Sequence, residues 1–408
     1  MKDYDVIIIG AGAAGMMCGW QAAKRGRRVC LIDHMRKIGE KIRISGGGRC
    51  NFTNLYCTAE NFISQNPHFC KSALSRFSPY DFMALLDERG IKYHEKQYKG
   101  EGLHDKAPLN SQGQMFCDES AGDIIDMLKK GCEEHGAVFQ RGTKVSGYEK
   151  TDKGFVLQTD QGDFTCQSLV IASGGLSIPK IGASNFGYEL AKKFGLNIVP
   201  PKAALVPLTF DEELLEKTKP LSGASIDAAV KAECGQAFRE GLLFTHRGLS
   251  GPSILQISSY WREKEAIEIN LLPDLDVLQA LKERKNKTPK QQLKTVLSEL
   301  LPSRIAGLML AFIEFSDQRM ADLSDKKLQY AAELIERWQV VPKGSEGYRT
   351  AEVTLGGIDT SSISSKTFEA KTVEGLYFIG EVLDVTGHLG GHNFQWAWAS
   401  GFCAGSVV

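Results

Sequence analysis

The sequence contains no long apolar run. Nowhere among its 408 residues does an apolar stretch reach the roughly 20 residues that a membrane-spanning helix needs. The first predicted strand begins at Asp5, so there is no room before it for a secretory signal peptide. We therefore expect a cytoplasmic protein with no membrane partner.

Net charge and paired cysteines are also absent. Lysine and arginine together number 49, as do aspartate and glutamate, and this balance is not typical of a dedicated nucleic-acid binder. The ten cysteines contain no Cys-x-x-Cys pair, which favours reduced thiols over a disulfide framework or a zinc site. We expect a small-molecule substrate rather than a nucleic acid, and no metal; the sequence indicates no oligomeric state.

One stretch near the N-terminus predicts a nucleotide-binding strand–turn–helix–strand unit. Val6 to Ile9 form a β-branched run typical of a buried parallel strand, and Gly10, Gly12 and Gly15 follow at GxGxxG spacing before a helical segment. The first glycine permits the sharp turn, the second lets the backbone approach a pyrophosphate, and the third lets the helix pack on the strand. Asp33 ends the next strand, where its carboxylate can accept hydrogen bonds from a ribose.

A second glycine-rich segment runs from Gly39 to Asn51. Its three consecutive glycines, Gly46 to Gly48, are explained by neither helix nor strand propensity, because each costs conformational entropy and adds no packing. Lys41, Arg43 and Arg49 place positive charge beside them. The segment therefore predicts a loop wrapped on an anionic or electron-rich ligand, with its N–H groups directed inward. A mobile surface loop is the alternative.

Together with the N-terminal turn, three further motifs resemble a known family. They are Arg43 to Asn51 (RISGGGRCN), Tyr377 to Asp384 (YFIGEVLD) and Gly390 to Trp398 (GGHNFQWAW). The chain resembles the BaiN/YhiN-like flavoproteins, also called the aminoacetone-oxidase-family FAD-binding enzymes, over essentially its whole length. The resemblance implies bound FAD and an α/β fold: a Rossmann-like FAD-binding domain of the glutathione-reductase-like type, with an inserted β-rich domain and a small helical domain.

The pattern along the chain suggests where these domains begin and end. Pro200 and Pro201 mark a boundary, after which short alternating strands give way to helical periodicity near Asp276. We predict a FAD-binding domain at 1–199 and 359–408, a β-rich insert at 200–274 that returns at 343–358, and a helical insert at 275–342.

The motifs and the resemblance together predict the cofactor-binding residues. The resemblance implies that Val145 contacts the adenine through its backbone and that Ser173 to Gly175 close the domain over the cofactor. It also implies that Glu381 binds the ribityl hydroxyls and that the backbone near Gly391 faces the flavin pyrimidine. The full predicted set is Gly10, Gly12, Ala13, Ala14, Gly15, Asp33, His34, Lys41, Arg43, Ser45, Gly46, Gly47, Gly48, Arg49, Cys50, Asn51, Val145, Ser173, Gly174, Gly175, Gly380, Glu381, Gly390, Gly391, Asn393, Phe394 and Gln395.

No catalytic acid is marked by a motif, but three histidines are candidates. His246, His388 and His392 can titrate near neutrality and lie in segments expected to face the cofactor, so one of them is a candidate proton donor. Alternatively, His246 and Arg247 hydrogen-bond a turn that precedes a helix. The His-x-x-x-His spacing of His388 and His392 falls in a glycine-rich loop, where it fixes no metal geometry.

These features predict a FAD-dependent oxidoreductase that transfers a hydride through flavin N5. Only one GxGxxG has the proper context, so NAD(P)H would dock transiently rather than on a domain of its own. We expect an NAD(P)H-dependent reductase of a small organic substrate. The alternatives are an amine oxidase that uses oxygen, a FAD-binding RNA-modification enzyme, or a non-catalytic partner-binding protein. A run of six basic residues between Lys282 and Lys294 is interpreted as a solvated helix face, because glutamate and glutamine interleave it.

Overall fold

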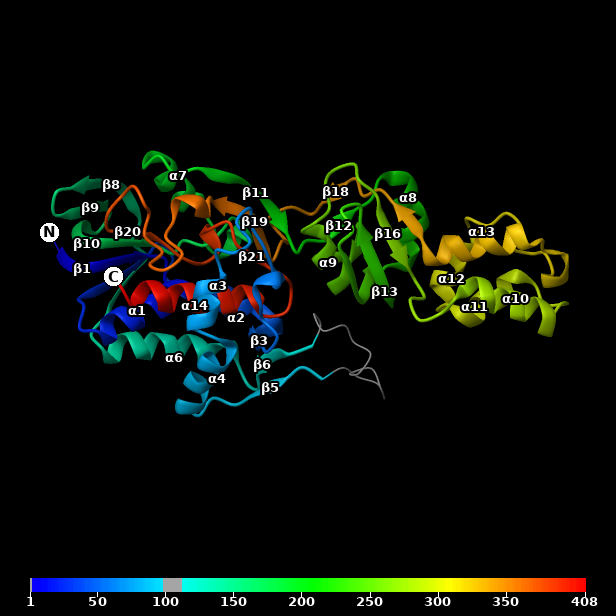
Figure 1. The fold of residues 1–408 in the computed structure, drawn as a ribbon, viewed down its shortest axis with the longest axis horizontal. Helices are drawn as coiled ribbons and strands as arrows, with labels where there is room; N and C mark the ends of the chain where they lie inside the picture. The colour runs from blue at the N-terminus through cyan, green and yellow to red at the C-terminus, as the bar shows by residue number, and fades with distance from the viewer. Residues whose placement is uncertain (1, 98–111) are drawn as a thin grey trace. The chain divides into compact units, whose positions relative to one another are not determined.

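The computed structural model describes residues 2–97 and 112–408. The chain divides into unit 1, made of Met1–Ala203 and Glu352–Val408, and unit 2, made of Ala204–Ala351. Each unit has its own hydrophobic core. Figure 1 draws the elements of both units and labels many of them.

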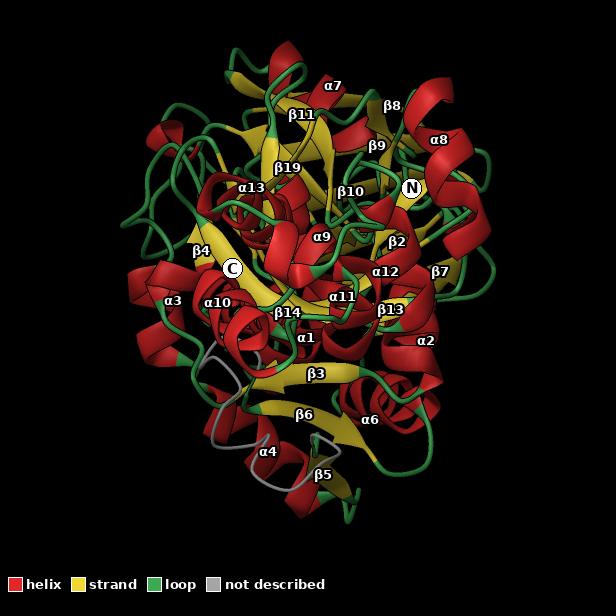
Figure 2. Cartoon of the chain, turned by 90° about the vertical axis from the view of Figure 1, so that its right-hand side faces the viewer, coloured by secondary structure: helices red, strands yellow, loops and turns green. Residues whose placement is uncertain are grey.

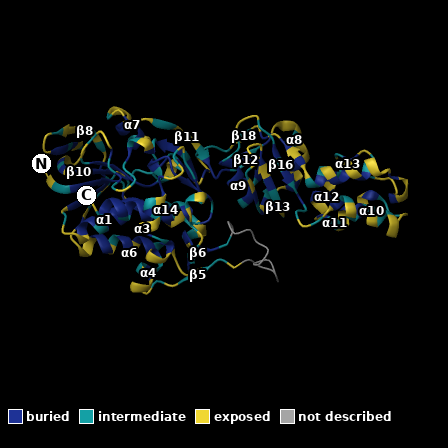
Figure 3. Cartoon of the chain, in the orientation of Figure 1, coloured by how far each residue is buried: buried dark blue, intermediate teal, exposed yellow. Residues whose placement is uncertain are grey.

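A mainly parallel sheet forms the centre of unit 1. Its path runs β7-β2-β1-β10-β9-β8, and β20 pairs with the last residues of β10, Leu169 to Ile171. The strands are β1 (Lys2–Ile9), β2 (Val29–Asp33), β7 (Val138–Arg141), β8 (Val145–Thr151), β9 (Gly154–Thr159), β10 (Gly162–Ile171) and β20 (Leu376–Phe378). The apolar ends of β1 and β10 run side by side, with Ile9 opposite Ile171, and Figure 3 shows these central strands buried. The predicted buried strand at Val6 to Ile9 is therefore confirmed.

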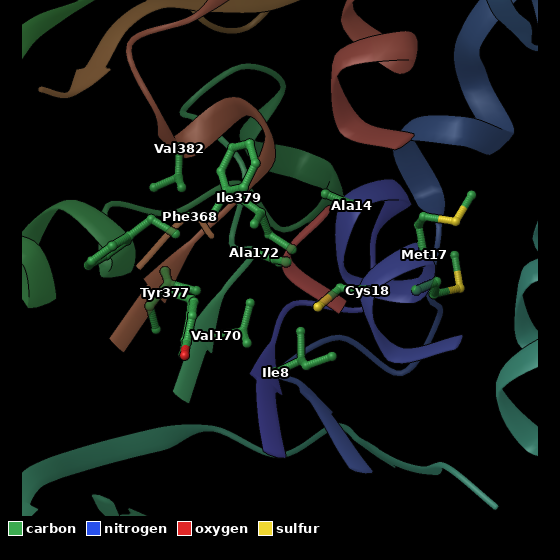
Figure 4. Close-up of a cluster of buried hydrophobic side chains, with 14 of the residues drawn as sticks. Ile8, Ala14, Met17, Cys18, Val170, Ala172, Phe368, Tyr377, Ile379 and Val382 are labelled. Atoms are coloured by element: carbon green, nitrogen blue, oxygen red, sulfur yellow. The ribbon is translucent and has the colours of Figure 1, made fainter. Parts of the chain in front are cut away.

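Helices pack around this sheet and against one another. They are α1 (Ala13–Lys24), α2 (Glu40–Ile44), α3 (Lys71–Arg76), α4 (Pro79–Glu88), α6 (Ala121–Glu134), α7 (Phe186–Lys193) and α14 (His392–Gly405). Helix α1 packs on α14, α6 and the first two strands. Figure 4 shows Ala14 and Cys18 of α1 in one apolar cluster with Ala172, which follows β10. Small residues at this contact allow the helix to approach the strand ends closely.

Short strands of unit 1 tie distant segments together. Strands β3 (Asn51–Asn54), β5 (Tyr93–Glu95) and β6 (Gln114–Cys117) form a small antiparallel sheet, which Figure 2 shows below the main body of the view. Strand β4 (Phe62–Ile63) pairs with β21 (Thr386–Gly387), and β11 (Ile198–Ala204) pairs with β19 (Val353–Ile358). The glycine-rich segment after β2 and the C-terminal motif are thereby held in the same unit.

Unit 2 is an antiparallel sheet packed with helices. Its sheet follows the order β17-β16-β13-β14-β15-β12-β18. The strands are β12 (Leu208–Thr209), β13 (Ser225–Ala232), β14 (Ala237–Phe244), β15 (Gly248–Ser250), β16 (Ile267–Asn270), β17 (Trp338–Val340) and β18 (Gly344–Ser345). The helices are α8 (Glu212–Thr218), α9 (Pro252–Ser258), α10 (Val277–Lys287), α11 (Leu293–Leu300), α12 (Ser303–Leu310) and α13 (Asp325–Glu336). Strand residues such as Ile269 and helix residues such as Leu297 share one core, so the predicted β-rich and helical inserts lie in one compact unit.

Candidate functional site

The GxGxxG turn has the tight geometry that its spacing predicts. Gly10 has a φ of 108°, and a Cβ placed on it would overlap the carbonyl of Ala172. A Cβ on Gly15 would overlap the carbonyl of Gly10, so the helix can pack against the turn only with glycine there. Gly12 is different, because a Cβ on it would meet nothing within 4 Å. It is the N-cap of α1, and no side chain caps the free N–H groups of this helix end.

Asp33 fixes the loop beside this turn. One carboxylate oxygen accepts a hydrogen bond from the Ala11 N–H at 2.9 Å, and the other accepts from the Met35 N–H at 2.8 Å. Each oxygen keeps a second lone pair, so the carboxylate can still accept a bond from a ribose hydroxyl. His34 is exposed beside it, and Val145 is half-buried at the start of β8.

The segment after β10 passes close to the same turn. Gly174 has a φ of 71°, and a Cβ on it would meet nothing within 4 Å. The hydroxyl of Ser173 is buried and has no hydrogen-bond partner among the described residues. Bare backbone at Gly12 and Gly174 and an unpartnered Ser173 hydroxyl fit a polar ligand such as the diphosphate and sugar portion of FAD.

The glycine-rich segment after α2 is an open turn with left-handed backbone. It forms the 3-10 turn Ser45–Gly48, in which Gly46, Gly47 and Gly48 have φ values of 55°, 66° and 88°. A Cβ on Gly47 or Gly48 would meet nothing within 4 Å, so their backbone is open to a ligand. Ser45 donates to the Ile42 carbonyl at 2.8 Å.

The residues that follow this turn anchor it. Cys50 is buried with a φ of 51°, and burial raises the pKa of its thiol. The side-chain amides of Asn51 and Gln114 approach to 3.1 Å. Arg49 is exposed, and Arg43 pairs with Glu40 of the same helix at 2.9 Å.

A charged cluster joins this segment to the C-terminal motif. Lys41 Nζ lies 2.6 Å from a Glu381 oxygen and donates to the Ser177 hydroxyl at 2.7 Å. The other Glu381 oxygen accepts from the Thr354 N–H at 2.9 Å and from Ser177 at 3.2 Å. A Cβ on Gly175 would lie 3.0 Å from this oxygen, so Gly175 lets Glu381 come close. Sequence reasoning selected Lys41 and Glu381 but missed Ser177 and Thr354.

The Gly380 and Gly390–Gly391 turns are both built against other parts of unit 1. Gly380 has a φ of 72°, and a Cβ on it would lie 2.9 Å from the Ala14 Cβ. A Cβ on Gly390, with a φ of 112°, would lie 3.2 Å from Gln114, and one on Gly391, with a φ of 94°, would overlap the Thr53 carbonyl. The three glycines therefore let the C-terminal motif approach α1, β6 and β3.

Polar side chains at the start of α14 hold this arrangement. Asn393 accepts from the Gly387 N–H and donates to the Gly387 carbonyl, both at 2.8 Å. Gln395 is fully buried, accepts from Thr53 at 2.6 Å and donates to the Phe77 carbonyl at 2.8 Å. The Phe394 ring stacks on Trp398 with centroids 5.6 Å apart. Asn393 and Gln395 thus have structural partners, whatever else they contact.

His388 and His392 lie together, at 6.4 Å between ring centroids, next to the α14 N-terminus. They are 7% and 1% exposed. Burial lowers the pKa of His388 to about 4 and that of His392 to about 3. Both rings are therefore neutral at pH 7, where an imidazole is a weak proton donor. His246 lies in unit 2, between β14 and β15, so the three candidate histidines do not share a unit.

The basic run on α10 and α11 is largely neutralised. Arg284 pairs with Glu299 at 2.8 Å, Lys287 with Glu283 at 3.2 Å, and Lys294 with Asp317 at 2.6 Å. Lys285 lies 3.7 Å from Asp325. These contacts agree with a solvated helix face rather than a surface for a polyanion.

Comparison with known proteins gives matches over the whole chain. A family model described as the HI0933-like protein Rossmann domain matches residues 4–407. The ribosomal RNA dihydrouridine synthase of Escherichia coli is 50% identical over 409 residues, which cover 100% of this chain and 99% of that protein. The protein of the same name from Haemophilus influenzae is 48% identical over 413 residues, with coverages of 100% and 99%. The 3-dehydro-bile acid delta(4,6)-reductase of Clostridium scindens is 26% identical over 417 residues, covering 98% of each chain.

One expectation from the sequence is wrong. We expected a small-molecule substrate rather than a nucleic acid, but the relatives at 50% and 48% identity are named for action on ribosomal RNA. The expectation rested on the net charge of the whole chain. A sum over all residues says nothing of how charges are distributed on the surface, so a neutral chain can still present a local basic region.

The sequence predicts no membrane partner, and the helices of the structure bear on this point. None of those within 2–97 and 112–408 combines the length and the apolar character of a bilayer span.

The family and the α/β fold predicted from the sequence motifs are confirmed by these matches and by the βαβ unit around the GxGxxG turn. The chain therefore belongs to the HI0933-like Rossmann family of FAD-dependent oxidoreductases, and it is an enzyme.

Proposed function

We propose that this protein is a FAD-dependent ribosomal RNA dihydrouridine synthase that takes its reducing equivalents from NADH or NADPH. The observation that supports this most strongly is identity of 50% and 48%, over all of this chain, to two proteins of that name. Because the matches extend through both units, they include unit 2 as well as the nucleotide-binding fold.

The reaction follows from the chemistry of the uracil ring. Its C5=C6 bond is conjugated with the C4 carbonyl, so C6 accepts a hydride and C5 then accepts a proton. The balance is uridine plus NAD(P)H plus one proton, giving dihydrouridine and NAD(P)⁺. The bile acid reductase relative is also named for reduction at a double bond, and a 3-dehydro group places a carbonyl next to it. The proposed reaction and the reaction in that relative's name are thus of one class, the reduction of a double bond next to a carbonyl.

Unit 1 offers the groups that would hold FAD. The free N–H groups of α1 after Gly12 would bind the pyrophosphate, and Asp33 would bind a ribose hydroxyl. The open backbone of Gly47 and Gly48 and the N-terminus of α14 would line the flavin portion. Bound FAD supplies a two-electron carrier between the nicotinamide and the substrate.

The chain's own polar cluster would organise this site. Lys41 and Glu381 link two segments that are 340 positions apart, and Ser177 and Thr354 fix the orientation of the Glu381 carboxylate. The oxygen of Glu381 that faces Lys41 then has one lone pair left for a hydroxyl-bearing ligand. We keep His246, His388 and His392 as candidate proton donors. Because His388 and His392 are neutral at pH 7, either of them can donate a proton only from the N–H group of its neutral ring.

Anaerobic stopped-flow absorbance tests this proposal. We expect NADH or NADPH to bleach the oxidised-flavin band of the purified yellow protein, and unmodified ribosomal RNA transcripts to restore that band in the absence of oxygen. Buffer without RNA serves as the control and is expected to leave the band bleached. If ribosomal RNA restores nothing while oxygen restores the band fully, the RNA-reductase proposal is wrong and an oxidase is favoured.

A further inference from the structure

We propose that unit 1 docks the backbone of ribosomal RNA on a basic surface beside the candidate cofactor site; this inference rests on the proposed function. The surface, which we call the basic rim, consists of Arg36, Lys37, Arg141, Lys144 and Lys180. The five residues come from three separate segments and form no run in the sequence.

The first two segments meet at the carboxyl ends of β2 and β7. Asp33 is in register with Arg141 across this strand pair. Beyond the strands, the Gly142 N–H donates to the Met35 carbonyl at 3.1 Å. A Cβ on Gly142 would lie only 3.3 Å from Cγ of Arg36. Arg36 and Arg141 are therefore neighbours, with Lys37 directly after Arg36 and Lys144 three residues after Arg141.

The third segment, 177–182, lies across the loop that follows β2. At one end, Ser177 accepts a hydrogen bond from Lys41 at 2.7 Å. At the other end, a Cβ on Gly182 would lie 3.2 Å from Nε2 of His34. Lys180, in the 3-10 turn Pro179–Ile181, falls between these two contacts. The same segment joins the basic rim to the cluster of Lys41 and Glu381.

The charges of the basic rim are available to a ligand. All five side chains are exposed, and within the described ranges none of them forms an ion pair. Three acids lie nearby: Asp33 accepts two backbone N–H bonds, Asp160 accepts the backbone N–H of Lys144 at 2.9 Å, and Glu40 pairs with Arg43. Asp33 and Asp160 carry two negative charges against the five cations of the rim.

A polyanion fits this arrangement better than a single nucleotide. FAD carries two phosphates, and the N-terminus of α1 already offers them N–H donors. Five further exposed cations exceed what one dinucleotide can use. Unpaired lysine and arginine side chains gain affinity for RNA because phosphate contacts release condensed counterions, whereas paired residues such as those on α10 gain less.

A pair of matched triple variants tests the basic rim. The rim variant is Arg36→Gln, Lys37→Gln, Lys180→Gln, and the control variant is Lys282→Gln, Lys287→Gln, Lys290→Gln. Each removes three exposed or half-exposed cations, so the net charge changes equally. Holoenzyme of each is assayed on unmodified ribosomal RNA transcripts with NAD(P)H, and RNA affinity is measured over a range of salt concentrations.

We expect the rim variant to raise KM for RNA about 10- to 100-fold, with kcat and the flavin spectrum unchanged and the salt slope shallower by about 2 to 3. The control variant is expected to behave like the wild type. Equal KM values and salt slopes for the two variants, with an active wild type, would overturn the rim and leave the proposed function intact. A wild type that neither binds nor reduces ribosomal RNA would overturn both.

Discussion

Gly12→Val is expected to give a folded protein that retains no FAD. The Gly12 backbone has a φ of −88° and a ψ of −163°, which valine can adopt, and a Cβ there would meet nothing within 4 Å. The new side chain would instead occupy the space in front of the α1 N–H groups, where the pyrophosphate must approach. We expect FAD affinity to fall by at least about 100-fold, measured as visible flavin absorbance per protein, with an unchanged far-ultraviolet circular dichroism spectrum.

Two other glycines provide the comparison. Gly307→Ala, in the exposed interior of α12, also adds a methyl group where nothing lies within 4 Å, and we expect it to retain FAD fully. Gly15→Val is expected to lose FAD together with stability, because its Cβ would overlap the Gly10 carbonyl. Full FAD retention by Gly12→Val would show that the α1 N-terminus is not the pyrophosphate site.

Acid is expected to destabilise unit 1 through the buried histidine pair. Burial lowers the pKa of His388 from 6.5 to about 4 and that of His392 from 6.5 to about 3. Below pH 6.5 the unfolded chain therefore binds more protons than the folded chain. The free energy of unfolding is at its full value above that pH and decreases as the pH falls. By about pH 5 the two rings together lower the free energy of unfolding by about 4 kcal/mol.

Urea unfolding at about pH 7.5 and about pH 5 measures this loss. The double variant His388→Asn, His392→Leu is expected to show a flatter dependence on pH than the wild type. His135→Asn, at an exposed histidine, is the matched control and is expected to keep the wild-type slope. If the double variant loses as much stability as the wild type between the two pH values, the buried rings are not the source of the acid sensitivity.

The βαβ unit and its turn are predictable from the sequence because their signals are local. Gly10, Gly12 and Gly15 lie within six positions, and the structure gives Gly10 and Gly15 the close backbone contacts that their spacing indicates. Helix α6 is similarly local, and its Ile124 and Leu128 are buried on one face as their spacing predicts. Helical patterning also extends from Lys71 to Gly90, and the structure has two helices there, α3 and α4. Pro79 begins the second of them, with Ser78 as its N-cap.

The organisation of the site around Glu381 could not be derived in this way. Lys41 and Glu381 were each selected from their own motif, but nothing in the sequence pairs residues 340 positions apart. Ser177 and Thr354 carry no motif at all, and only the packing of their segments brings them to Glu381. The basic rim was missed for the same reason, since its members are scattered, whereas the basic run that is visible in the sequence is neutralised by acids from other segments.

The most direct test of the proposed activity is nucleoside mass spectrometry of ribosomal RNA. RNA is taken from cells that lack this gene and is incubated with the FAD-loaded protein and NAD(P)H. We expect each modified uridine to gain two hydrogens, so that dihydrouridine appears in treated RNA and is absent from RNA incubated with Gly12→Val. An unchanged dihydrouridine content after incubation with an active, NAD(P)H-reducible flavoprotein would contradict the proposed function.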